Sequence, residues 1–290
     1  VVRNRGGIGD GTGATANGGT VKIFYWGSFC GAVAAGNYGR TNTKQIPAPI
    51  LAVSNASTTA TYPTVQSAVT AAANGQVLHL LNGYWGESIN LSRKTNITLV
   101  ARSWVQSSIN TNAKIDPASG PAIVMTNARG VVVRGLAIKG AVEGVAVRGT
   151  SRSNAVDSCR VFSNAIGIVE ASGGIRNRFV NSLVYANTGA GIVIGGPLSV
   201  VSNQRIKGNG AEGLRLTNGA TNRAIRNAIY SNGTYGIRIL NATNNIVINN
   251  SLTRNSSGGI FLQSGLANRV INNIAQSNGP AIGAGIKDTA

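Results

Sequence analysis

The sequence predicts an all-β solenoid, in which short strands and turns stack as successive rungs. Three observations lead to this prediction. A strand motif that begins with Gly recurs every 22 to 24 residues along the second half of the chain. An Asn recurs in a second column at the same period. Each repeat contains short runs of alternating apolar residues and nothing with the period of a helix.

The Gly column and the Asn column each mark one position in every predicted rung. The strand motifs begin at Gly144, Gly167, Gly191, Gly213, Gly236 and Gly259. The second column consists of Asn164, Asn187, Asn209, Asn232, Asn255 and Asn278. We expect rungs about 4.8 Å apart, with Val, Ile and Leu inside and Asn amides stacked from rung to rung. Asn also tolerates the left-handed backbone of tight turns.

The segment 62–75 predicts a short helix ahead of the rungs. Val65, Ala68, Val69 and Ala72 fall on one helical face, and Asn74-Gly75 supplies a stop. Residues 77–87 then fit a first rung.

These features resemble the right-handed parallel β-helix proteins of the pectate-lyase-like superfamily, especially the Asn-rich repeats of periplasmic nitrous-oxide-reductase maturation proteins. The resemblance covers roughly residues 60 to 290. It implies a right-handed parallel β-helix of about nine to ten rungs with a short N-terminal capping helix and an N-terminal arm. It does not assign an activity, because the superfamily contains lyases, hydrolases, epimerases, adhesins and inert surface proteins.

The composition divides the chain into two parts. Residues 1–55 form a Gly-rich arm or cap with one strong strand at 21–26, and residues 56–290 form the β-helix. The arm either shields the first rung or docks on a neighbouring subunit. No apolar run is long enough to span a membrane. The chain opens Val1-Val2-Arg3 and reads as a mature form, so we expect a secreted, extracellular or cell-surface protein, with the periplasm as a further possibility.

The sequence contains few residues that could act as catalytic groups or metal ligands. There are 26 Lys and Arg against eight scattered Asp and Glu, for a net charge of +18. Scattered acids argue against a calcium cage or a pair of catalytic carboxylates. With one histidine, His79, and two cysteines, Cys30 and Cys159, we expect no metal and no cofactor. The cysteines form either a disulfide or two buried thiols.

Basic and aromatic residues recur in outward columns and give the candidate binding residues. One column contains Arg215, Arg238 and Phe261, a second contains Arg178, Arg223 and Arg269, and a third contains Phe162, Tyr185, Lys207 and Tyr230. Like charges stacked one rung apart repel unless an anion lies across them. An acidic polysaccharide or an anionic surface would satisfy them, whereas no nucleic-acid-binding module is present. The alternative is a solvated basic exterior.

Two functions follow from these patterns. The first is an extracellular structural β-helix that self-assembles into a filament, sheath or layer, adheres to anionic glycans, or does both. A homo-oligomer or polymer would form through Val21, Ile23, Tyr25, Ile282 and Ile286. The second is a polysaccharide lyase or related carbohydrate-active enzyme, metal-independent, with Arg or Lys as the base and Tyr as the acid. The shortage of carboxylates favours the first, and we assign no catalytic residue.

Overall fold

The computed structural model describes residues 21–25, 41–45, 50–54, 58–80, 82–101, 113–279 and 286–288. The chain divides into two units, Val1–Pro49 and Ile50–Ala290. In the first unit, β1 (Val21–Tyr25) pairs in parallel with β2 (Thr41–Gln45). In the second unit, β3 (Ile50–Ser54) pairs antiparallel with β4 (Thr58–Tyr62) and with β5 (Val77–Leu80).

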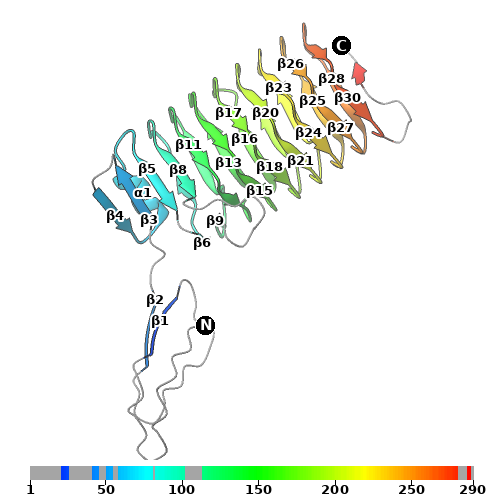
Figure 1. Ribbon diagram of the computed structural model, residues 1–290. Helices are drawn as coiled ribbons and strands as arrows, with labels where there is room; N and C mark the ends of the chain where they lie inside the picture. Colours follow the sequence, from blue (N-terminus) through cyan, green and yellow to red (C-terminus); the bar gives the residue numbers. More distant parts are fainter. Residues whose placement is uncertain are drawn as a thin grey trace, which may run out of the picture. The chain divides into compact units, whose positions relative to one another are not determined.

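The second unit is a parallel β-helix with three sheets, and Figure 1 shows its rungs stacked from β5 to β30. Sheet I contains β7 (Ile89–Asn90), β10 (Ile123–Thr126), β13 (Glu143–Arg148), β16 (Ile166–Glu170), β19 (Ile192–Ile194), β22 (Leu214–Thr217), β25 (Tyr235–Leu240), β28 (Gly258–Gln263) and β31 (Ile286–Asp288). Sheet II contains β3, β4, β5, β8 (Thr98–Ala101), β11 (Val132–Arg134), β14 (Ala155–Asp157), β17 (Arg178–Val180), β20 (Val200–Ser202), β23 (Arg223–Ile225), β26 (Ile246–Ile248) and β29 (Arg269–Ile271). Sheet III contains β6 (Gly83–Trp85), β9 (Ala113–Ile115), β12 (Ala137–Ile138), β15 (Arg160–Phe162), β18 (Leu183–Tyr185), β21 (Arg205–Lys207), β24 (Ala228–Tyr230), β27 (Ser251–Thr253) and β30 (Ile274–Gln276).

The predicted fold class is confirmed. Sheets I and III each hold nine strands, which correspond to about eight complete turns from the first strand to the last. The count is slightly below the nine to ten rungs expected. The predicted helix is α1 (Val65–Ala71), which begins with a capping box formed by Thr64 and Ser67. The Glu87 carboxylate accepts hydrogen bonds from the N–H groups of Val65 (2.7 Å) and Gln66 (2.9 Å), at the positive end of this helix.

Stacked polar side chains line all three corners of the β-helix. Between sheets III and I, Asn187 Oδ1 accepts from both Asn164 N (3.1 Å) and Asn164 Nδ2 (3.0 Å), and the pattern continues to Asn278. This is the predicted Asn column. Two further ladders occupy the other corners, from Asn154 to Asn268 between sheets I and II, and from Cys159 to Asn273 between sheets II and III. These buried amides satisfy the backbone of each turn, so most of the Asn content is structural.

Candidate functional site

The structure places the three predicted columns on three different sheets. Arg215 pairs with Arg238, and Arg238 with Phe261, on the outer face of sheet I. On sheet II, Val200 and Ile246 separate Arg178, Arg223 and Arg269, so these arginines lie two rungs apart. Tyr185, Lys207 and Tyr230 follow one another on sheet III. The predicted residues therefore do not form one surface.

The two arginines on sheet I already have a counter-charge. Glu212, whose side chain is 4% exposed, accepts from Arg215 Nη2 at 2.6 Å and from Arg238 Nη1 at 2.9 Å. Burial alone would raise the pKa of Glu212, but the hydrogen bonds from Arg215 and Arg238 hold it below its usual range. Arg238 also donates to Gln263 and lies over the Phe261 ring at 5.9 Å. The expectation that this column needs an outside anion overlooked Glu212.

Sheet III carries the densest group of cations and aromatic rings. We call it the basic-aromatic face, and it consists of Tyr84, Lys114, Lys139, Arg160, Phe162, Tyr185, Arg205, Lys207 and Tyr230. Within the described part of the chain, the acid paired with a cation of this face is Asp116, which contacts Lys139 at 3.1 Å. Sequence reasoning found only four of these nine residues. Strand pairing aligns Arg160 and Arg205 through Leu183, a column that the repeat spacing from Gly144 onward could have revealed.

Aromatic rings and cations share the columns of this face. The rings of Phe162 and Tyr185 stack with centroids 4.9 Å apart. Lys207 Nζ lies 5.9 Å from the Tyr185 centroid and 6.0 Å from that of Tyr230, within cation–π range. Arg205 Nη2 donates to the Tyr230 hydroxyl at 3.0 Å. Burial raises the pKa of Tyr185 despite the opposing charge of Arg160, so the phenol stays protonated at neutral pH.

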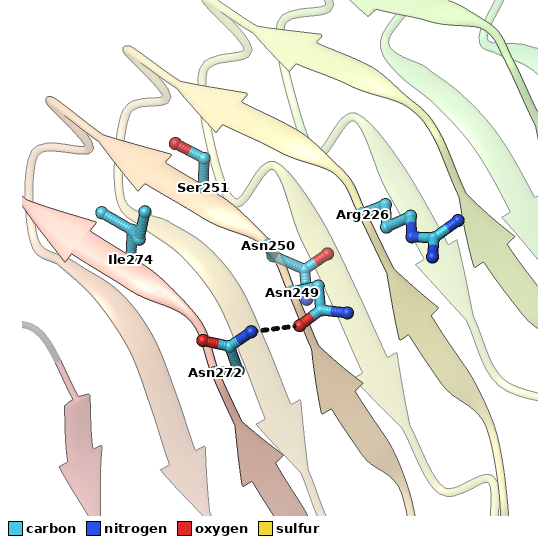
Figure 2. Close-up of a pocket in the computed structure, with 6 residues that line it drawn as sticks. All are labelled: Arg226, Asn249, Asn250, Ser251, Asn272 and Ile274. Carbon is cyan, nitrogen blue, oxygen red and sulfur yellow. Dashed lines mark hydrogen bonds between the residues drawn. The ribbon is translucent and has the colours of Figure 1, made fainter.

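A shallow polar groove of about 370 Å³ lies beside this face, where sheets II and III meet. It is lined by Arg226, Asn249, Asn250, Ser251, Asn272 and Ile274. Figure 2 shows the hydrogen bond in which Asn272 Nδ2 donates to Asn249 Oδ1, at 2.7 Å, with the side chain of Arg226 beyond Asn249. Amide groups with one cation suit a hydroxyl-rich ligand with a negative group.

The sequence of this chain matches a known protein family. Residues 81–257 and 199–289 match the family described as "Periplasmic copper-binding protein (NosD)". The chain belongs to the NosD family. This membership confirms the resemblance noted from the sequence, and a periplasmic family agrees with the expected location. No described helix is long and apolar enough to cross a membrane. A comparison with curated proteins finds no match.

Solved structures similar to this NosD-family chain include an alginate epimerase, an alginate lyase and a pectate lyase. A mutant of the periplasmic alginate epimerase AlgG has a TM-score of 0.59 at 12% identity, over 68% of this chain and 50% of that one. An alginate lyase from Paenibacillus sp. str. FPU-7 has a TM-score of 0.55 at 17% identity, over 78% of this chain and 95% of that one. Pectate lyase Pel9A has a TM-score of 0.53 at 19% identity, over 76% of both chains. The chain spans about half the length of the epimerase. These identities establish a shared fold only.

The residues of this chain do not fit the copper in the family description. Copper sites use His, Cys and Met, and the chain contains one His, one Met and two Cys. Met125 is fully buried in sheet I, and Cys159 is buried at the corner of sheets II and III. Burial raises the pKa of the Cys159 thiol to about 12, so no thiolate forms at neutral pH. Among the described residues, no three His, Cys, Asp or Glu side chains gather. Cys30 lies outside those residues.

Proposed function

We propose that this protein binds an acidic polysaccharide along the basic-aromatic face of sheet III. The observation that carries the proposal is the excess of positive charge there. Lys114, Lys139, Arg160, Arg205 and Lys207 share one face, and only Lys139 has an ion-pair partner in the described residues. A linear polyanion that runs along the solenoid would place successive acidic groups against successive rungs.

The aromatic rings support a sugar polymer over other polyanions. Phe162, Tyr185 and Tyr230 are half-buried and stand in one column with Lys207, so flat apolar surface lies next to charge. Binding sites for small polar ligands combine such apolar area with a few placed polar groups. The similar structures include enzymes named for pectate and alginate, and this supports the same class of polymer here.

Two matched double variants test the proposal. We expect Arg205→Ala with Lys207→Ala to weaken binding of polygalacturonate or alginate about tenfold or more, equivalent to about 1.4 kcal/mol. The control, Arg178→Ala with Arg223→Ala, removes the same charge from sheet II and should bind almost as the wild type does. Calorimetric titrations at low and high salt give the readout, and binding should fall with salt. Equal losses in both variants, or equal binding of RNA, would contradict the proposal.

A second candidate function is a metal-independent polysaccharide lyase that uses the same face. It is favoured by the protonated Tyr185 phenol beside Lys207. In β-elimination, a basic side chain of this face would take the proton from the carbon next to the carboxylate. The carbon–oxygen bond to the next sugar would then break, a carbon–carbon double bond would form, and Tyr185 would protonate the leaving oxygen. Ultraviolet absorbance of the unsaturated product tests this candidate, and no absorbance change with a bound polymer would exclude it.

Self-assembly also stays a prediction. The backbone of β1 contains Val21, Ile23 and Tyr25, and that of β31 contains Ile286. Their side chains, and all of Ile282, lie outside what the structure describes. Sedimentation velocity at rising concentration would test it with the full chain and with Ile23→Lys. A concentration-dependent shift that the substitution abolishes would support assembly, whereas a single monomer peak would contradict it.

A further inference from the structure

Among the described residues, Arg160 has no partner for its charge. It lies on the outer face of sheet III, where β15 pairs Arg160 with Ala137 and Leu183. The residue is only 5% exposed. Its Nε and Nη1 atoms are both buried without a hydrogen-bond partner. Buried polar groups are almost always paired, so two orphaned donors on one guanidinium require an explanation.

Four other arginines of the β-helix show what Arg160 lacks. Arg215 and Arg238 share Glu212, and the exposed Arg134 and Arg148 have Asp157 and Glu143. None of the carboxylates in the described part of the chain pairs with Arg160. The side chain close to it is Tyr185, whose phenol is neutral. The described residues therefore supply no anion for Arg160.

We propose that Arg160 is the residue that recognises the carboxylate group of a uronic-acid unit. This inference rests on the proposed function and assigns its specificity. Nη2 of Arg160 is not among the buried, unpartnered atoms and belongs to both bidentate edges of the guanidinium, so a carboxylate that reaches it can also accept from Nε or Nη1. The stacked rings of Phe162 and Tyr185 extend along the same face, where a sugar ring attached to that carboxylate would lie. Lys207, beyond Tyr185, is then placed for the acidic group of a following unit.

The test uses Arg160→Met, Arg160→Lys and the control Arg178→Met. Arg178 is exposed on sheet II, so its substitution removes the same charge elsewhere. Binding of oligogalacturonate and of a sulfated oligosaccharide is measured by titration calorimetry. We expect Arg160→Met to weaken oligogalacturonate binding at least tenfold, Arg160→Lys to weaken it several-fold because the fork is lost, and the control to change it less than twofold. Arg160→Met should change binding of the sulfated ligand less than twofold.

Stability separates a lost contact from a lost fold. Because Arg160→Met removes an unpaired buried charge, its urea midpoint should equal or exceed that of the wild type. If wild-type protein binds no acidic oligosaccharide, the proposed function fails. If wild type binds and Arg160→Met binds equally well, the proposed function stands and this inference is wrong. Equal loss of the carboxylated and sulfated ligands overturns the assignment to carboxylate. If Arg160→Met unfolds, the oligogalacturonate affinity of Arg160→Lys is compared with that of the wild type instead, and equal affinity would show that the inference is wrong.

Discussion

Sheets I and III carry arginines and lysines at the same rung spacing, yet the two faces differ in what balances the charge. On sheet I, the buried Glu212 accepts from both Arg215 and Arg238. On sheet III, Arg160, Arg205 and Lys207 have no carboxylate partner in the described residues, and Lys207 lies between two tyrosine rings. A column of cations is therefore a sign of a ligand only where the fold supplies no anion.

The two buried carboxylates, Glu212 and Glu170, also differ in what balances their charge. This difference gives the largest effect that we expect on stability. Glu212 has two cations, whereas Glu170 has only hydrogen bonds from Asn177 (2.5 Å) and Ser199 (2.9 Å), and its Oε2 atom has no partner. Burial raises the pKa of Glu170 to about 7, against the lowering effect of these hydrogen bonds. The folded protein therefore binds this proton more tightly than the unfolded chain does.

We predict that Glu170→Gln removes a pH-dependent loss of stability. In the wild type, the contribution of Glu170 is fully present below the unfolded pKa of 4.5 and declines as pH rises to about 7. The loss is on the order of 3 kcal/mol. Urea unfolding at pH values from about 4 to about 8, which is roughly the range of this titration, measures the loss in the free energy of unfolding. The variant should be the more stable protein at the alkaline end. A wild-type profile that rises across this window would contradict the prediction.

The second prediction concerns the carboxylate that balances sheet I. Glu212→Gln leaves Arg215 and Arg238 half-buried without a counter-charge, so we expect a loss of about 2 kcal/mol in the free energy of unfolding. Glu143→Gln is the control, because Glu143 pairs with the more exposed Arg148 and should cost under about 1 kcal/mol. The lowered pKa of Glu212 means that its contribution is present above the unfolded pKa and is lost as pH falls through the folded value. Equal costs for the two variants would show that burial is unimportant here.

The smallest expected effect separates binding from catalysis on sheet III. Tyr185→Phe keeps the ring that stacks on Phe162 and removes only the hydroxyl. Binding of oligogalacturonate should therefore change less than about twofold, which is under about 0.5 kcal/mol. If the face is a lyase site, the same substitution should abolish formation of the unsaturated product. A large loss of binding would instead assign the hydroxyl a role in recognition.

Much of the fold could be predicted from the sequence because the repeat is regular from Gly144 onward. The Gly and Asn columns fix which residues share a rung position, and strand pairing follows them through Gly213 and Gly236. The first rung does not keep this period, since Gly83 pairs with Ala113 across a longer insertion. The regular spacing holds again from Lys114 through Ala137 to Arg160, so Lys114 and Lys139 could have been placed on sheet III by counting back one or two rungs. The other two ladders were missed because other residues interrupt the Asn pattern. Cys159, Ser182 and Gln204 do so between sheets II and III, and Ser199 does so between sheets I and II.

The candidate site was predictable only in part, for a different reason. Periodicity indicates which residues share a column, but not which of three sheets carries that column or what lies beside it. Glu212 stands at a corner, three residues before Arg215, and reaches Arg238 on the next rung. Arg160 reads as one more surface cation in the sequence, and only its burial identifies it as unpaired.

The most direct test of the account compares the two faces in one binding experiment. Arg205→Ala with Lys207→Ala is titrated with oligogalacturonate beside Arg215→Ala with Arg238→Ala, after circular dichroism has shown that both variants keep the β-helix. The account predicts that the sheet III variant loses at least tenfold in affinity, because its cations have no internal anion, and that the sheet I variant loses less than about twofold. Loss of binding in the sheet I variant with full binding in the sheet III variant would contradict the account.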